Sequence, residues 1–209
     1  MFDCIWYFAK DHAIQNMKSS NKRGPAITKY LVHKTIVLVG MMGAGKTAVG
    51  RSLARRLAVP FRDSDEEIVK AANMPIAEIF ARDGEAFFRD RETEVITRLL
   101  TGPPGVLSTG GGAFLKACNR ALIAERGVSV WLNADLGLLW QRVRHKTTRP
   151  LLHTPDPRAT LKRLYEERVP HYARADLEVR SDPGCAIEEM SARVLACLLE
   201  KRPDVVEKN

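Results

Sequence analysis

Residues 35–47 read Thr35-Ile-Val-Leu-Val-Gly40-Met-Met-Gly-Ala-Gly45-Lys46-Thr47, and this stretch is the most informative part of the chain about its fold. Its first five residues form an apolar, β-branched run that predicts a strand buried on both faces. The next eight match the phosphate-loop pattern GxxxxGK[ST], and apolar side chains then recur at helical spacing over 46–58. A phosphate loop belongs between a buried strand and a helix, so the context supports the motif.

The residue types of this loop fit the binding of a nucleoside triphosphate. Glycines let successive backbone N–H groups converge on an anion, and the helix N-terminus adds positive potential. Lys46 is expected to reach the β- and γ-phosphate oxygens, and the Thr47 hydroxyl to bind Mg²⁺. No NKxD-type guanine reader occurs in the chain, which favours ATP over GTP. The residues expected to hold the nucleotide here are Gly43, Ala44, Gly45, Lys46, Thr47 and Ala48.

Composition places the chain among ordinary globular proteins. It has 209 residues, with 33 Lys+Arg against 25 Asp+Glu, 45% hydrophobic and 28% charged residues, which excludes a largely disordered chain. No apolar run approaches the roughly 20 residues of a spanning helix, so no membrane association is expected. The four cysteines show neither CxxC pairs nor neighbouring histidines, which favours reduced thiols and a cytoplasmic location over a metal site.

The remaining periodicity predicts an α/β fold in one folded unit, residues 35–200. Short apolar runs at 106–108, 128–132 and 177–179 neighbour helix-period stretches at 114–126, 135–146 and 185–200. Such alternation predicts a parallel sheet covered by helices on both faces. Residues 1–34, basic and rich in polar residues, are interpreted as a poorly ordered N-terminal extension, and residues 201–209 as a C-terminal tail.

Two segments interrupt the alternation. Residues 64–101 are helical in pattern almost throughout, with breaks at Asn73–Pro75 and near Asp83–Gly84, which predicts a helical insertion beside the sheet. Residues 147–158, TTRPLLHTPDPR, contain three prolines and are too irregular for a helix or strand. A lid loop has this character, and an ordinary surface loop is the alternative.

A pair of carboxylates, Asp63-Ser-Asp65, follows a predicted second strand at Pro60-Phe61. Carboxylates at i and i+2 on an extended segment point the same way, so both could face a pocket at the carboxyl end of the sheet. One could hold Mg²⁺ through water while the other accepts a hydrogen bond from a substrate hydroxyl. The alternative is a helix N-cap at Asp63 or Ser64.

Two further clusters point to an acceptor site. In Phe87-Phe88-Arg89-Asp90-Arg91-Glu92, an arginine beside aromatic residues could present its planar fork to a carboxylate; a core phenylalanine stripe with surface ion pairs is the alternative. In Ser108-Thr109-Gly110-Gly111-Gly112, three glycines would let a ligand lie against backbone N–H groups. Many P-loop ATPases carry an acidic residue after the corresponding strand. None follows this strand here, which argues against an ATPase of that type.

Together, GMMGAGKT, DSD, FFRDRE, STGGG and RPLL, in this order over about residues 35–200, resemble the shikimate kinase family. The resemblance implies a three-layer α/β/α P-loop kinase fold with a five-stranded parallel sheet, a substrate-binding insertion at about 64–101 and a lid at about 147–158. It also implies Mg²⁺-dependent transfer of the ATP γ-phosphate to the 3-hydroxyl of shikimate, on the route to chorismate and the aromatic amino acids.

The same resemblance implies roles for individual residues. Asp65 corresponds to the candidate base, which also holds the shikimate hydroxyls, and Asp63 lies, with Thr47, on the Mg²⁺ side. Lys46 and Arg149 correspond to residues acting on the transferred phosphate, whereas Arg142 and Pro183 correspond to the adenine side. The residues implied for the shikimate pocket are Phe80, Phe88, Arg89, Glu92, Gly111, Gly112 and Arg168.

Alternatives remain within and outside this family. Gluconate kinase, or another small-metabolite kinase of the same fold, would share the phosphate loop. The net charge of +8 would also suit a nucleic-acid-binding ATPase, although no nucleic-acid motif is present. A catalytically inactive regulator is the third alternative. The motifs and the resemblance together favour a monomeric enzyme that binds shikimate and ATP, and not nucleic acid.

Overall fold

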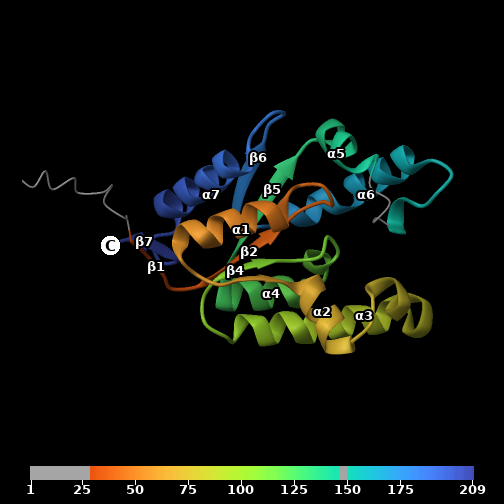
Figure 1. Ribbon diagram of the computed structural model, residues 1–209, viewed down its shortest axis with the longest axis horizontal. Coiled ribbons are helices and arrows are strands. Elements are labelled where there is room, and N and C mark those ends of the chain that lie inside the picture. The colour runs from red at the N-terminus through yellow and green to blue at the C-terminus, as the bar shows by residue number, and fades with distance from the viewer. Residues whose placement is uncertain (1–28, 146–149) are drawn as a thin grey trace, which may run out of the picture.

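Five parallel strands form the centre of the fold, in the order β3-β4-β2-β5-β6 (Figure 1). The structure is a computed structural model and describes residues 29–145 and 150–209. The strands of this sheet are β2 Thr35–Val39, β3 Phe61–Asp63, β4 Val106–Ser108, β5 Gly127–Ala134 and β6 Leu177–Ser181. Their order and direction confirm the predicted five-stranded parallel sheet.

Helices connect these strands and cover the sheet. The α-helices are α1 Lys46–Leu57, α2 Ser64–Ala72, α3 Ile76–Leu100, α4 Ala117–Arg126, α5 Leu136–Val143, α6 Pro157–Tyr172 and α7 Ile187–Lys201, with short 3₁₀ turns η1 Ala113–Leu115 and η2 Pro150–Leu152. Helix α1 packs against α7, and α3 packs against α4 (Figure 1). None of the helices in the described ranges is long and apolar enough to cross a membrane.

Burial along the strands shows that helices cover both faces of the sheet. Successive side chains of a strand point to opposite faces, and all five residues of β2 are buried. In β6, at the edge of the sheet, burial alternates with exposure, so one face of that strand is open to solvent. The molecule therefore has the predicted three-layer α/β/α arrangement, with β2 at the centre of the core.

The helical insertion is present as predicted. Residues 64–101 form α2 and α3, which pack against each other beside β3. The helical conformation is interrupted between them at residues 73–75. Gly84 has non-helical φ/ψ angles of 82° and 171° inside α3, at the second predicted break. The sequence pattern did not predict α6. Its first residues, Pro157 and Arg158, fall within the stretch that was expected to be a loop over 147–158.

The folded unit extends further at both ends than the predicted bounds of 35–200. Strands β1 Tyr30–Val32 and β7 Val206–Lys208 pair antiparallel in a separate two-stranded sheet, although 29–34 was assigned to the extension and 201–209 to the tail. Val205 and Val206 are fully buried. The pairing joins segments about 175 positions apart along the chain, so no local sequence pattern predicts it. Residues 1–28 of the predicted extension lie outside the described residues.

Candidate active site

The phosphate loop leaves the carboxyl end of β2 and enters α1, as the sequence predicted. Gly43 and Gly45 have φ angles of 85° and 93°, in the left-handed region that favours glycine. A Cβ on Gly43 would lie 2.7 Å from Val143 of α5, so the loop packs too closely on that helix for a larger residue. Lys46 Nζ donates to the carbonyl oxygens of Gly40 and Met41, at 2.8 and 3.1 Å, and lies across the loop.

A cavity of about 670 Å³ opens on this loop. Its lining includes residues 42–49 of the loop and the start of α1, together with Asp63, Asp65, Gly110 and Gly111. The carboxyl ends of the parallel strands therefore bring the phosphate loop, the paired carboxylates and the glycine turn to one cavity. This is the edge of an open α/β sheet at which ligands bind.

The Asp63 carboxylate caps α2 and also contacts the phosphate loop. Asp63 is the N-cap of α2, and its Oδ1 accepts from the backbone N–H of Asp65 at 3.1 Å. Its Oδ2 accepts from Thr47 Oγ1 at 3.0 Å, which joins it to the phosphate loop. The expectation of an extended segment through Asp65 was wrong, because α2 begins at Ser64. Asp65 nevertheless lines the cavity, from the first turn of the helix.

The glycine turn after β4 lies against polar side chains from two helices. A Cβ on Gly110 would be 2.7 Å from Asp65 Oδ1 and 3.0 Å from Glu92 Oε1. A Cβ on Gly112 would overlap the guanidinium group of Arg89. A larger residue at either position would force these side chains of α2 and α3 to move away from the turn.

Two residues of α6 also approach this turn. A Cβ on Gly111 would be 3.5 Å from Arg168 Nη1, and Arg168 is buried. Tyr172 Oη donates to the Gly111 carbonyl oxygen at 2.5 Å. Burial raises the pKa of Tyr172 to about 12, so the phenol stays protonated as a donor at neutral pH. Two arginines from different helices, Arg89 and Arg168, therefore meet at one glycine turn.

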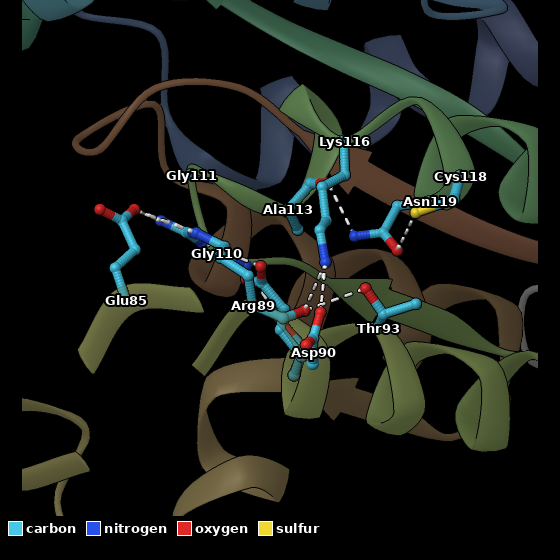
Figure 2. A network of polar contacts seen from close by, with 12 residues as sticks. Glu85, Arg89, Asp90, Thr93, Gly110, Gly111, Ala113, Lys116, Cys118 and Asn119 are labelled. Carbon is cyan, nitrogen blue, oxygen red and sulfur yellow. Dashed lines mark hydrogen bonds and ion pairs between the residues drawn. The ribbon is translucent and has the colours of Figure 1, made fainter. Parts of the chain in front are cut away.

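Two carboxylates hold Arg89 in place. Its Nη1 donates to Glu92 Oε2 at 2.8 Å, and its Nε and Nη2 donate to Glu85 Oε1 at 3.3 and 3.1 Å; Figure 2 shows the Glu85 pair. Glu92 is fully buried, and its Oε1 has no hydrogen-bond partner among the residues that the structure describes. Burial, with a smaller contribution from Asp65, raises the pKa of Glu92 above its usual value despite the adjacent Arg89. A ligand hydroxyl or water near Gly110 would satisfy this oxygen.

Aromatic rings wall the same region. The rings of Phe80 and Phe88 lie 4.6 Å apart between centroids, and the guanidinium group of Arg89 is 5.2 Å from the Phe88 ring. Phe88 is buried, whereas Phe87 is exposed. One face of α3 therefore contributes to the core and also places Arg89 beside the glycine turn.

On the nucleotide side, Arg142 of α5 reaches the loop. It donates to the Gly43 carbonyl oxygen at 3.3 Å and to Ser181 Oγ at 3.2 Å. Pro183, predicted for this side, follows β6 but does not line the cavity; Ser181, Cys185 and Ala186 do. These three residues lie at or just after the carboxyl end of β6. That position was the sequence signal that could have identified them, since parallel strands end at the site. Arg149 lies outside the described residues.

Comparison with known proteins places the chain in a family. The model of a family described as shikimate kinase matches residues 42–199, more than half of the chain. The chain belongs to the shikimate kinase family. A shikimate kinase from Ruegeria pomeroyi is 68% identical over 176 residues, covering 84% of this chain and 90% of the relative. A shikimate kinase from Cereibacter sphaeroides is 65% identical over 174 residues, covering 83% and 86%.

Solved structures agree with this assignment to the shikimate kinases. The shikimate kinase from Acinetobacter baumannii in complex with shikimate has a TM-score of 0.77 and 39% identity, covering 81% of this chain and 94% of that one. A gluconokinase from Sinorhizobium meliloti has a TM-score of 0.55 and 20% identity, which shows a shared fold and nothing about substrate. Family membership makes the chain an ATP-dependent kinase and confirms the resemblance inferred from the motifs.

Proposed function

We propose that this chain transfers the γ-phosphate of ATP to the 3-hydroxyl of shikimate, giving shikimate 3-phosphate and ADP. Membership of the shikimate kinase family supports the reaction. The observation that carries the proposal for this chain is that one cavity joins the phosphate loop to Asp65 and the glycine turn. A donor phosphate and an acceptor hydroxyl need such an arrangement, because transfer depends on positioning and on charge stabilisation.

On the nucleotide side, the backbone N–H groups of residues 43–48 would bind the phosphates. Lys46 would exchange its carbonyl partners for phosphate oxygens, where negative charge shifts during transfer. Arg142 is assigned to the adenine side, and its contact with Gly43 supports that place. Arg149 is assigned to the phosphates, and Pro183 to the adenine side, from the resemblance of their motifs alone.

Mg²⁺ is the metal proposed for this site, held by Thr47 and Asp63. Their hydroxyl and carboxylate are hard oxygen donors already in contact at 3.0 Å, which fits Mg²⁺. Among the described residues no group of three or more His, Cys, Asp and Glu side chains forms a metal cage. This also fits Mg²⁺, which keeps waters and binds through few side chains and the substrate phosphates. When bound, it would neutralise charge on those phosphates.

On the acceptor side, the two arginines would hold the carboxylate of shikimate. Arg89 offers a planar fork beside Gly112, and Arg168 lies beside Gly111. The backbone of the two glycines would contact the ring, with Phe80 and Phe88 on the apolar side. Asp65 would accept the proton of the 3-hydroxyl as it attacks the phosphate, the role of a general base in phosphoryl transfer.

The proposed reaction takes place within one chain in the cytoplasm. The described residues supply the phosphate loop, both arginines and Asp65 from one molecule, so a monomer suffices. Anionic ligands account for basic residues at the site without a nucleic-acid partner. Retention on immobilised DNA that weakens steeply with salt would contradict this part of the proposal.

The experiment that tests the proposal measures ADP release with Mg·ATP and either shikimate, gluconate, a nucleoside monophosphate or no acceptor. Turnover with shikimate alone is expected. Turnover that is equal without acceptor, or that needs another acceptor, would overturn the assignment of Asp65 and Arg89 while leaving the phosphate loop in place.

A pair of variants tests the acceptor site itself. Arg89→Met should lower kcat/KM for shikimate by at least about 100-fold, because bidentate charge-assisted hydrogen bonds to a carboxylate are lost, and leave KM for ATP near normal. The matched control is Arg91→Met on the same helix, where the guanidinium pairs with Glu94 at 2.7 Å and lies over Phe87. Full activity in Arg89→Met would rule out the proposed role.

A further inference from the structure

Lys116 connects two elements of the acceptor site without lining the cavity. It lies between η1 and α4, and its Nζ donates to the backbone carbonyl oxygen of Arg89 at 3.3 Å and to Asp90 Oδ1 at 2.9 Å. Figure 2 shows the side chain reaching from the start of α4 to α3. Lys116 is therefore bonded to the main chain of the very residue whose guanidinium group lies on Gly112.

The segment between Gly112 and Lys116 is itself fixed to α4. Asn119 Nδ2 donates to the Ala113 carbonyl oxygen at 2.9 Å, and Asn119 is fully buried. Arg120 Nη1 donates to the carbonyl oxygens of Phe114 and Leu115, at 2.8 and 2.6 Å. The glycine turn, η1 and the first turn of α4 thus form one braced unit, and Lys116 links that unit to α3.

Arg89 is consequently held against this unit at two points. Its guanidinium group packs on the backbone of Gly112. Its carbonyl oxygen accepts from Lys116, which follows Gly112 by four residues. The spacing of these two contacts sets where the guanidinium fork stands relative to Gly111 and Gly112. Movement of α3 away from the braced unit would displace the fork from the glycine turn.

The position of Lys116 at the start of α4 does not by itself explain why a lysine stands there. Lys116 is the N-cap of α4, and its side chain makes no capping hydrogen bond. Ser, Thr, Asp and Asn are favoured at N-caps because their oxygens accept backbone N–H groups, whereas the lysine ammonium group has no acceptor. A residue that conflicts with its local structure is expected where it serves a site elsewhere.

We propose that Lys116 is a positioning residue for acceptor recognition, which holds Arg89 at the correct distance from the glycine turn to bind the substrate carboxylate. The inference rests on the proposed function, because it assigns that carboxylate to Arg89. Lys116 acts through Arg89 and Asp90, so its loss should weaken acceptor binding and leave nucleotide binding unchanged.

The test is Lys116→Ser, which removes the link to α3 and supplies a favoured N-cap. KM for shikimate should rise about three- to ten-fold, less than the more than ten-fold effect of losing a charge-assisted hydrogen bond to the substrate itself, because Lys116 acts through Arg89. KM for ATP and kcat should change less than about two-fold. The Tm should stay equal or increase, because the new cap stabilises α4. A purely structural role would instead lower Tm and affect both substrates together.

Two further variants complete the design. Lys116→Arg keeps a cation of sufficient reach and should recover most of the shikimate KM. Lys70→Ala is the matched control, since Lys70 is an exposed lysine paired with Glu67 at 2.8 Å on α2; it should resemble the unmodified chain.

The outcomes separate this inference from the proposed function. If the unmodified chain turns over shikimate but Lys116→Ser has the same KM as Lys70→Ala, Lys116 does not position Arg89. An equal rise in KM for ATP and shikimate, or no recovery in Lys116→Arg, would also overturn the inference. If the unmodified chain shows no shikimate-dependent turnover, the proposed function fails, and the inference fails with it.

Discussion

Tyr172 fixes the orientation of one peptide unit in the proposed acceptor site. The carbonyl group of Gly111 and the N–H group of Gly112 belong to one planar peptide unit and point in opposite directions. Because Tyr172 Oη donates to the Gly111 carbonyl oxygen, the Gly112 N–H is directed away from α6. The ring is fully buried, with its centroid 6.3 Å from that of Trp131, so its position is set by core packing. A core residue thereby controls a backbone donor proposed to face substrate.

Tyr172→Phe removes this hydrogen bond and keeps the ring. We expect KM for shikimate to rise about three- to ten-fold, because the Gly111 carbonyl oxygen loses a donor worth about 1 kcal/mol and the peptide gains freedom to rotate. The Tm should fall by roughly 2–4 °C. Steady-state kinetics with each substrate and thermal unfolding check both. Tyr165→Phe, two turns earlier on α6, is the control, and equal KM values in the two variants would contradict this role.

At the scale of elements, α3 joins two helical segments that differ in direction. Gly84 interrupts the helix with φ 82° and ψ 171°, angles that residues with a side chain rarely adopt. Phe80 precedes this kink, and Phe88 and Arg89 follow it. The kink therefore sets how Phe80 stacks on Phe88, and so the shape of the apolar wall beside Arg89.

Gly84→Ala should destabilise the protein through backbone strain alone, since no atom of the described residues beyond the adjoining helix turns lies within 4 Å of the added Cβ. Strain of about 1–3 kcal/mol lowers Tm by roughly 2–12 °C for a chain of this size. KM for shikimate should rise more than KM for ATP, because Phe80 is displaced. Gly102→Ala serves as the control: its backbone has no positive φ, and its Cβ would make ordinary contact at 3.6 Å. An unchanged Tm in Gly84→Ala would contradict the strain argument.

The elements that the sequence predicted are those encoded by local patterns. A buried strand, a glycine loop and an amphipathic helix occur consecutively at 35–57, and proline or glycine marks both breaks in 64–101. The sequence could not decide whether Asp63 is a helix cap or a carboxylate of the site, because both need the same residue type at the same place. Helix α6 was missed because its start is proline-rich and Pro170 lies inside it. Lys116 and Tyr172 carry no motif, since their roles depend on contacts across the fold.

At the scale of the whole molecule, the two ends of the described chain meet in the sheet of β1 and β7. The His33 N–H donates to the Val205 carbonyl oxygen at 2.8 Å, and Lys34 pairs with Asp204 at 2.9 Å. Arg202 and Lys34 hold the pKa of Asp204 well below its usual range. Residue 34 immediately precedes β2, so this sheet lies at the amino ends of the parallel strands (Figure 1). The cavity lies at their carboxyl ends.

The double variant Val205→Ala, Val206→Ala tests whether this terminal sheet stabilises the fold without shaping the site. Both side chains are fully buried, and removing about four buried methyl groups costs about 4 kcal/mol, which lowers Tm by roughly 8–16 °C. At a temperature well below the lowered Tm, KM for both substrates should be unchanged, because the variant sites and the cavity lie at opposite ends of the strands. Glu207→Gln is the control: this exposed residue pairs with His33, and its loss should shift Tm by less than about 2 °C. A Tm decrease no larger than that of the control would mean that the parallel sheet is stable without its terminal pair; altered KM values would mean that the two ends of the molecule are coupled through β2.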